Sequence, residues 1–248
     1  MTKVYFIGAG PGDVDLITVK GRKILSRCQV VIYAGSLVSA KHLDFAPEAA
    51  ETHDSSSLSL DHIRSILESA KERRLDVARL HTGDPSLYGA IREQIEMCEN
   101  LGLEWEVVPG VSSAFAAAAR LGVEYTIPGG TQTLIFTRME GRTPVPPEEN
   151  LALLAARHSS IAIFLSVHDI ENVTQQLLES LPPATPVVVA ARVTWPDESF
   201  VRGTLSDIAE KVRAAGITKT ALILVGEALI SQGRRSYLYH EDFKHGYR

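Results

Sequence analysis

A short apolar segment followed at once by a glycine-containing turn constrains the fold of this chain most. The central copy is residues 77–80 followed by residues 81–90, where Gly83, Asp84 and Pro85 stand side by side. Glycine allows a close approach to the backbone, aspartate caps a helix or accepts a hydrogen bond, and proline suits the first helical turn. The pattern predicts a strand, a tight turn and a helix. In a parallel sheet this turn lies at the carboxyl end of the strand, where ligands bind, although a plain capped connection explains the same residues.

A second copy stands at the amino terminus, where residues 3–7 lead into Gly8-Ala-Gly-Pro-Gly-Asp13. This turn is similar to a dinucleotide fingerprint, but Asp13 replaces the third glycine and residues 30–35 offer no acidic partner for a ribose. Pro11 also removes an amide that would bind a pyrophosphate. We therefore expect this turn to shape a pocket wall, which disfavours a nucleotide-dependent oxidoreductase.

Alternating strands and helices continue along the chain and are typical of a parallel α/β sheet. A third strand, at residues 105–108, leads into a turn at 109–113. We expect Asp61 to cap one helix and another helix to run from residue 87 to residue 101. The later strands are expected at residues 134–136, 161–165, 186–191 and 221–225, and the later helices at 148–156, 170–181 and 205–215. The rhythm breaks near residues 125–130, so we predict two α/β lobes, residues 1–128 and residues 129–248.

Composition limits the classes of protein that this chain can belong to. The chain is 45% hydrophobic and 22% charged, as in an ordinary globular protein. Its net charge of -5 argues against general binding to nucleic acid or to a membrane surface. Cys28 and Cys98 stand far apart, so we expect neither a disulfide framework nor a structural zinc site, and no metal. No leader-type or membrane-spanning apolar run is evident, and we expect a cytoplasmic protein.

Several motifs taken together resemble the tetrapyrrole methyltransferases of cobalamin biosynthesis. They are Gly8-Ala-Gly-Pro-Gly-Asp13 with Asp15-Leu-Ile-Thr18, His81-Thr-Gly-Asp-Pro85, Val108-Pro-Gly-Val-Ser112 and Thr194-Trp-Pro-Asp197. Residues 33–39, 137–144 and 191–197 are similar to the branch that methylates C11 of precorrin-4, in its metal-free or cobalt form. Gly35 departs from relatives that carry an acidic residue there. The resemblance covers nearly the full chain.

The resemblance implies two α/β lobes with S-adenosylmethionine in the cleft between them, and a homodimer. Carried over position by position, the cofactor contacts are Pro11, Thr82, Gly83, Asp84, Leu87, Ser112, Ser113, Leu165, Ser166, Ala191, Arg192 and Gly226. The carboxylates of the tetrapyrrole need cationic partners, for which the candidates are His81, Arg138 and Arg142, with Arg192 beside them. The catalytic candidates are Asp13, Arg142 and Glu140.

The implied reaction is methyl transfer from S-adenosylmethionine to C11 of the tetrapyrrole in the synthesis of the cobalamin (vitamin B12) ring. A sulfonium methyl group is already activated, so the main tasks are to align the attacking carbon and to exclude water. Two alternatives stay open: methylation at another precorrin or uroporphyrinogen ring carbon, and a non-catalytic protein that binds the cofactor. The residues do not tell whether the substrate already holds cobalt.

Overall fold

The computed structural model describes residues 2–141, 143–230, 233, 236, 237, 243 and 246. By its internal contacts the chain divides into two compact units. The first comprises Met1–Ala116 with Val193–Asp197, and the second comprises Ala117–Arg192 with Glu198–Arg248. This division assigns residues 117–128 to the second unit, whereas the sequence placed the lobe boundary after residue 128; that boundary stays a prediction.

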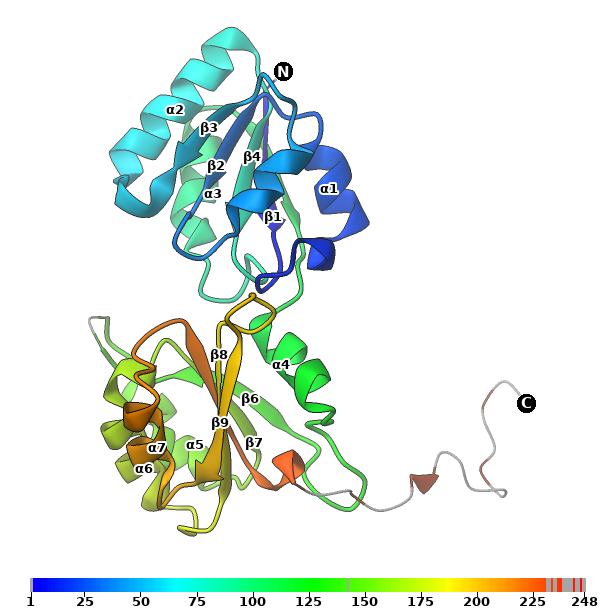
Figure 1. Cartoon of the computed structure of the whole chain (residues 1–248). Helices are drawn as coiled ribbons and strands as arrows, with labels where there is room; N and C mark the ends of the chain where they lie inside the picture. Colours follow the sequence, from blue (N-terminus) through cyan, green and yellow to red (C-terminus); the bar gives the residue numbers. More distant parts are fainter. Residues whose placement is uncertain are drawn as a thin grey trace. The chain divides into compact units, whose positions relative to one another are not determined.

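The first unit is built on a five-stranded parallel sheet in the order β3-β2-β4-β1-β5 (Figure 1). The strands are β1 Lys3–Gly8, β2 Val30–Tyr33, β3 Glu51–Asp54, β4 Val77–His81 and β5 Glu104–Val108. The helices are α1 Val19–Leu25, α2 Leu60–Arg73, α3 Ile91–Asn100 and α4 Ser113–Leu121, the last of which ends in the second unit. Short 3-10 helices are η1 Val14–Leu16, η2 Ala40–Phe45 and η3 Ser55–Ser57.

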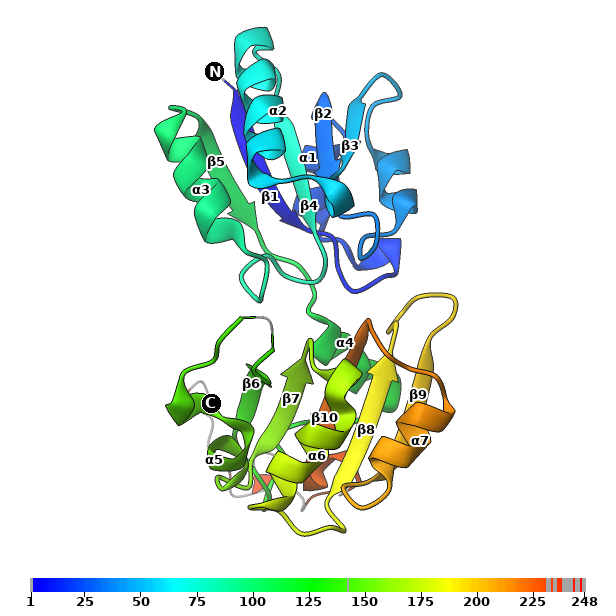
Figure 2. The same ribbon diagram turned by 90° about the vertical axis from the view of Figure 1, so that its left-hand side faces the viewer.

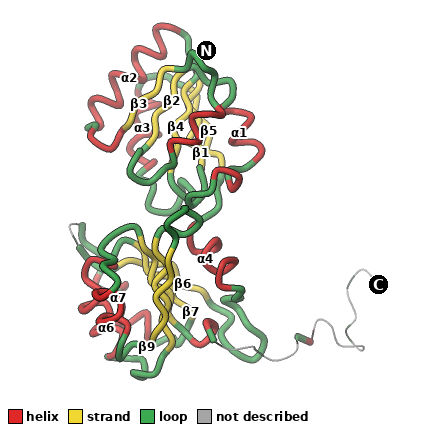
Figure 3. Tube along the Cα trace, viewed as in Figure 1, coloured by secondary structure: helices red, strands yellow, loops and turns green. Residues whose placement is uncertain are grey.

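Helices cover both faces of this sheet (Figure 3). Ile7 packs with Leu25 of α1 on one face, whereas Phe6 packs with Leu67 of α2 and Ile95 of α3 on the other. Successive strand residues point to opposite faces, so a strand buried on both faces is apolar along most of its length. The adjacent strands β1 and β4 are followed by helices on opposite faces, and such a switch point is where open α/β sheets bind ligands.

Short polar side chains cap the first turns of two helices in this unit. The Thr18 hydroxyl accepts a hydrogen bond from the Gly21 amide and caps α1. Helix α2 is capped by Ser59, whose hydroxyl accepts from the His62 amide, while the His62 ring accepts from the Ser59 amide. The prediction that Asp61 caps this helix is therefore wrong, because the reciprocal pair places the cap two residues earlier.

The second unit contains a mixed sheet in the order β6-β7-β10-β8-β9. Its strands are β6 Leu134–Arg138, β7 Ser160–Phe164, β8 Pro186–Ala191, β9 Ser199–Thr204 and β10 Ala221–Val225. Helices α5 Leu151–Ala155, α6 Ile170–Leu178 and α7 Ile208–Ala214 cover one face (Figure 2). Short 3-10 helices are η4 Pro147–Glu149, η5 Val167–Asp169 and η6 Glu227–Leu229.

The second sheet is mixed, unlike the parallel sheet of the first unit. β6 and β7 are parallel, but β10 is antiparallel to both of its neighbours and β9 is antiparallel to β8. A buried apolar run has no direction of its own, so the sequence pattern does not distinguish the two arrangements. Two of the four edge strands, β3 and β9, are not predicted from the sequence because polar residues interrupt them.

Within the described residues, no helix is both long enough and apolar enough to cross a membrane. The longest of the helices named above, α2, has 14 residues and a mixed polar composition.

Three glycines allow the turns after β1, β4 and β5 to meet. A Cβ atom on Gly110 would lie 2.1 Å from the carbonyl oxygen of Gly83 and 2.7 Å from the Cα atom of Gly8. A Cβ atom on Gly8 would in turn lie 2.5 Å from the Gly110 backbone. A side chain at Gly8 or Gly110 would force the turns apart, whereas Gly83 contributes its positive φ of 63°.

We expect Gly110→Ala to lower the free energy of unfolding by about 1 to 3 kcal/mol, the usual cost of overpacking. Urea unfolding followed by circular dichroism measures it. Gly141→Ala is the matched control, because nothing lies within 4 Å of a Cβ atom there, and its stability should equal that of the wild type. An equally stable Gly110→Ala protein would contradict the close approach of the turns.

Candidate functional site

Backbone hydrogen bonds join the first turn to the central turn at the switch point. The Ala9 amide donates to the His81 carbonyl over 2.8 Å, and the Gly83 amide donates to the Gly10 carbonyl over 2.8 Å. The Gly10 amide donates back to the Gly83 carbonyl over 3.3 Å. Gly10 and Gly83 both have positive φ, 78° and 63°, which glycine adopts without strain. The two turns therefore form one small antiparallel bridge beyond the ends of β1 and β4.

Asp84 connects the central turn to the third turn. One carboxylate oxygen accepts from the Ser86 amide over 2.8 Å and from the Ser86 hydroxyl, and the other accepts from the Gly110 amide over 2.8 Å. Partial burial opposes ionisation, but these donors outweigh it and hold the pKa of the carboxyl below its ordinary value. The carboxylate does not cap a helix that starts at residue 87, because α3 begins only at Ile91.

The predicted cofactor residues of the first unit lie together on these three turns. They are Pro11, Thr82, Gly83, Asp84, Leu87, Ser112 and Ser113. Ser112 is buried, and its hydroxyl accepts from the Ala114 amide over 3.3 Å at the start of α4. A Cβ atom on Gly83 would lie 3.7 Å from the Cα atom of Ser112, so the central and third turns are in contact. Their role in binding a cofactor stays a prediction.

Asp13, the predicted catalytic carboxylate, is exposed and caps η1. Its Oδ1 atom accepts from the Asp15 amide over 3.0 Å. The Asp13 amide donates to the Thr194 hydroxyl over 2.9 Å. The structure thus gives Asp13 a turn-stabilising role, and a direct part in the chemistry stays a prediction.

The segment Val193–Asp197 contacts the first turn residue by residue. The indole Nε1 of Trp195 donates to the Pro11 carbonyl over 2.9 Å. A Cβ atom on Gly12 would lie 2.3 Å from the indole Cδ1 atom, so the ring lies directly against this glycine. Sequence reasoning noted the motif of residues 194–197 but assigned no role to it. The signal was present in the tryptophan and proline, which are unusual in a solvated loop.

His81 is only 6% exposed, and its environment is unlike that of a residue that binds a substrate carboxylate. Burial, with a contribution from the nearby charge of Arg79, lowers the pKa of the imidazole to about 3. The ring is therefore neutral near pH 7 and carries no charge to attract a carboxylate. Its Nε2 atom has no hydrogen-bond partner among the described residues.

Arg79 is a buried cation that sequence reasoning did not single out. Its Nε donates to the Gln94 side-chain oxygen over 3.1 Å, and the Gln94 amide group donates to the Ala90 carbonyl over 3.2 Å. Burial lowers the pKa of the guanidinium to about 10, which leaves it charged at neutral pH. The pair connects β4 through α3 to the end of the central loop. An arginine inside an apolar strand was the signal that could have found it.

In the second unit, strand direction decides which predicted residues lie at the same end of the strands. Arg138, Leu165 and Ala191 lie at or next to the carboxyl ends of β6, β7 and β8, which point the same way. Gly226 follows β10, which points the opposite way, and its amide donates to the carbonyl of Pro186, where β8 begins. The structure therefore does not bring Gly226 together with the other predicted cofactor residues.

Several strands are followed by strained backbone. Left-handed φ values occur at eight non-glycine residues, of which Tyr88 and Ala90 follow β4, Leu165 follows β7, and Arg192 and Thr194 follow β8; the others are Arg74, His158 and Thr220. Such conformations cost about 1 to 3 kcal/mol each and concentrate at functional sites. Leu165 is also 65% exposed, which is unusual for a leucine, and its neighbour Ser166 is buried. The observation marks the turn after β4 in the first unit, and the turns that follow the second-unit strands β7 and β8, as candidate binding segments.

Two predicted side chains in the second unit bind the protein itself. The Ser166 hydroxyl accepts from the Met139 amide over 2.9 Å and donates to the Phe164 carbonyl over 2.7 Å. The Arg138 guanidinium donates to the carbonyls of Thr143 and Pro144 over 3.1 and 2.7 Å. These contacts fix the loop after β6, so the geometry favours Arg138 as a support of the loop over Arg138 as a substrate contact.

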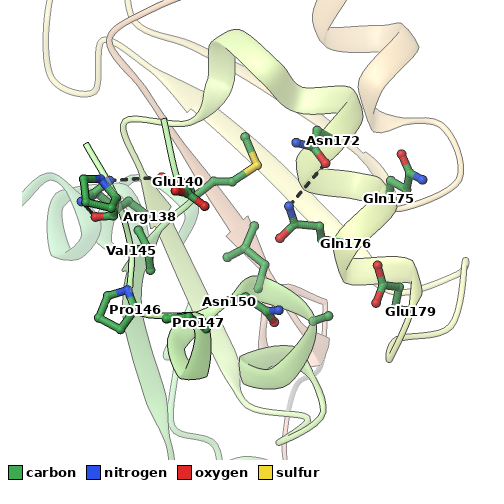
Figure 4. A pocket seen from close by; sticks show the side chains of 14 residues that line it. Arg138, Glu140, Val145, Pro146, Pro147, Asn150, Asn172, Gln175, Gln176 and Glu179 are labelled. Carbon is green, nitrogen blue, oxygen red and sulfur yellow. Dashed lines mark hydrogen bonds between the residues drawn. The ribbon is translucent and has the colours of Figure 1, made fainter. Parts of the chain in front are cut away.

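A pocket of about 760 Å³ lies between this loop, α5 and α6. Arg138 and Glu140 line one side, and Asn172 and Gln176 of α6, with Glu179 directly after this helix, line the other (Figure 4). Glu140 is exposed, and its predicted catalytic role is not tested by this geometry. Arg142 lies outside the described residues.

The two cysteines are free and buried, and burial raises the pKa of the Cys28 thiol to about 12 and that of Cys98 to about 11. Both thiols are therefore protonated and unreactive at neutral pH. Across the described part of the chain, no cluster of three or more histidine, cysteine, aspartate or glutamate side chains could hold a metal ion.

We expect His81 to make the folded protein sensitive to acid. The unfolded chain binds a proton at His81 near pH 6.5, whereas the folded protein does so only near pH 3, so stability is lost as pH falls through this range. Between pH 6.5 and 5 the wild type should lose about 1.5 kcal/mol more than His81→Gln in urea unfolding. His168→Gln, at an exposed histidine, should keep the wild-type dependence. If the free energy of unfolding falls equally with pH in the wild type and in His81→Gln, folding does not hinder protonation of the His81 ring, and the prediction is wrong.

Comparison with known proteins places this geometry in a family. The sequence pattern of the tetrapyrrole (corrin/porphyrin) methylases matches residues 3–209. The cobalt-precorrin-4 C(11)-methyltransferase of Methanocaldococcus jannaschii is 50% identical over 248 residues, which cover 99% of this chain and 96% of the relative. The precorrin-4 C(11)-methyltransferase of Pseudomonas aeruginosa is 48% identical over 246 residues, which cover 99% of this chain and 98% of the relative.

Two solved structures of methyltransferases also match this chain. The X-ray structure of a cobalamin biosynthetic enzyme, cobalt precorrin-4 methyltransferase, matches with a TM-score of 0.89 and 46% identity, covering 92% of this chain and 96% of the other. Uroporphyrin-III C-methyltransferase from Thermus thermophilus, complexed with S-adenosylhomocysteine, matches with a TM-score of 0.77 and 27% identity, covering 92% and 93%. The resemblance predicted from the motifs is confirmed, and the chain belongs to the tetrapyrrole methylase family.

Proposed function

We propose that this chain transfers a methyl group from S-adenosylmethionine to C11 of precorrin-4 or of cobalt-precorrin-4, in the synthesis of the cobalamin ring. The observation that carries the proposal is an identity of 48% to 50% over almost the whole chain to relatives named for this reaction. One of these relatives is named for the cobalt form and the other for the metal-free form. The similarity therefore supports the reaction and does not choose between the two substrates.

The residues at the three glycine turns fit S-adenosylmethionine in their chemistry. They offer backbone amides and carbonyls, small side chains and strained loops at a switch point, and the turns are held in place by Asp84. We assign Pro11, Thr82, Gly83, Asp84, Leu87, Ser112 and Ser113 to cofactor binding in the first unit, and Leu165, Ser166, Ala191 and Arg192 in the second. Gly226 is not part of this assignment because it lies at the opposite end of the strands from the other predicted residues of the second unit.

When bound, S-adenosylmethionine would supply a methyl group on a positively charged sulfur; the attacking carbon would form a bond to this methyl group as the carbon–sulfur bond breaks and S-adenosylhomocysteine leaves. The residues of this chain then have to hold the two reactants in line and keep water out. Asp13 and Glu140 are the proposed carboxylates for orienting the ring or accepting a proton. Arg142 and Arg192 are the proposed partners of the substrate carboxylates, because guanidinium binds carboxylate through two hydrogen bonds. A homodimer and a cytoplasmic location stay predictions.

The proposal is tested first by isothermal titration of the folded protein with S-adenosylhomocysteine, with NADH as the control ligand. We expect S-adenosylhomocysteine to bind and NADH not to bind. An assay with precorrin-4 and its cobalt form then follows, and nuclear magnetic resonance of the product identifies the methylated carbon. Methylation at another ring carbon would overturn the assignment to C11. If the protein binds the cofactor but transfers its methyl group to none of the precorrins offered, the protein is a non-catalytic binding protein.

We expect Arg142→Ala to raise the KM for the tetrapyrrole about tenfold or more while the affinity for S-adenosylhomocysteine stays the same, since hydrogen bonds to charged groups contribute about 1.5 to 3 kcal/mol. Steady-state kinetics and calorimetry measure the two effects separately. Arg157→Ala, at an exposed arginine, serves as the control for charge alone. Equal losses in both measurements would indicate misfolding and remove Arg142 from the substrate site.

A further inference from the structure

Three consecutive residues of the first turn each contact the segment Val193–Asp197. The carbonyl of Pro11 accepts from the Trp195 indole over 2.9 Å, Gly12 lies against the indole ring, and the amide of Asp13 donates to the Thr194 hydroxyl over 2.9 Å. All of these residues belong to the first unit, although Val193–Asp197 is far from the turn in sequence. The shape of the turn therefore depends on this distant segment.

These contacts fill needs that the turn does not meet by itself. Pro11 is buried, so its carbonyl requires a donor, and the indole supplies one. Gly12 has no side chain, which lets the flat ring approach its Cα atom. A Cβ atom there would lie 2.3 Å from Cδ1 and 2.6 Å from Nε1 of the indole. The glycine and the tryptophan are thus matched to each other in shape.

The segment itself is held in an uncommon conformation. Arg192 and Thr194 have φ values of 48° and 66°, in the left-handed region, and Val193 between them is buried. Residues that carry a Cβ atom adopt this region only where surrounding contacts outweigh the steric cost. The strained backbone directs the hydroxyl of Thr194 and the indole of Trp195 onto the same turn.

We propose that Thr194 and Trp195 are positioning residues that hold residues 11–13 in the shape that binds S-adenosylmethionine. The inference rests on the proposed function, because Pro11 is one of the assigned cofactor residues. Neither side chain takes part in the chemical step. Trp195 fixes the carbonyl of Pro11 and the face of Gly12, and Thr194 fixes the amide of Asp13. Loss of either contact loosens the turn and weakens the cofactor's binding.

The chain contains two tryptophans, Trp105 and Trp195, so the contact can be observed directly. Trp105 is 39% exposed in β5 and pairs with Val4, away from the strand end that carries the turns. Trp105→Phe therefore leaves Trp195 as the single emitter and should bind S-adenosylhomocysteine as the wild type does. Titration of this variant should change the Trp195 emission along a saturation curve whose Kd equals the calorimetric value.

Two substitutions test the positioning role. Trp195→Phe keeps an aromatic ring and removes the indole donor, and the affinity for S-adenosylhomocysteine should fall about fivefold, as expected for one buried hydrogen bond. Thr194→Val removes the hydroxyl and should weaken binding similarly, whereas Thr194→Ser keeps the hydroxyl and should restore it. Circular dichroism and thermal unfolding verify that each variant is folded. The rescue by serine separates a contact of the hydroxyl from a general loss of packing.

The outcomes separate this inference from the proposed function. If the wild type binds S-adenosylhomocysteine, while Trp195 emission is constant and folded Trp195→Phe and Thr194→Val bind as tightly as the wild type, the positioning role is overturned alone. Failure of Thr194→Ser to recover the affinity lost in Thr194→Val would overturn the role of the hydroxyl. If the wild type itself does not bind S-adenosylhomocysteine, the proposed function falls and this inference falls with it.

Discussion

The backbone contact among Gly8, Gly83 and Gly110 is the constraint on which the candidate site depends. Neighbouring strands of a sheet lie about 4.8 Å apart, so the turns beyond them touch only where no side chain stands between them. A Cβ atom on Gly110 would come within 2.1 Å of the Gly83 carbonyl. Missing side chains bring the turns together, and Asp84 then fastens them with hydrogen bonds to Ser86 and Gly110. The shape of the site is thus a property of the backbone.

Much of the first sheet could be predicted because a buried parallel strand is apolar along its length. β1, β2 and β4 lie where those runs stand, and the edge strand β5 ends in the apolar pair Val107 and Val108. The polar edge strand β3 lacks that signal, as does β9 in the second sheet. Strand direction is a different matter, because it is set by the length and path of the connections and by pairing between distant residues. For this reason the reversal of β10 could not be inferred from residues 221–225 alone.

The glycine turns of the site could also be predicted, whereas the partners of its polar side chains could not. His81 and Arg138 were chosen as cations for substrate carboxylates, yet the first is neutral and buried and the second binds carbonyls of its own loop. A residue type tells which bonds a side chain can form but not which nearby group forms them first. Gly226 was predicted to lie with the other cofactor residues because the direction of β10 is not evident from the sequence. The structure places it at the opposite end of the strands.

The reaction proposed for this family member fits turns that are built from close backbone contacts. A methyl group on sulfonium needs alignment with a nucleophilic carbon more than it needs a strong acid or base. Alignment within fractions of an ångström requires a rigid backbone. Bridged turns, an aspartate that accepts from two different amides, and left-handed residues such as Leu165 and Arg192 supply that rigidity. The strain and the close packing of these turns are therefore what the chemistry requires of the fold.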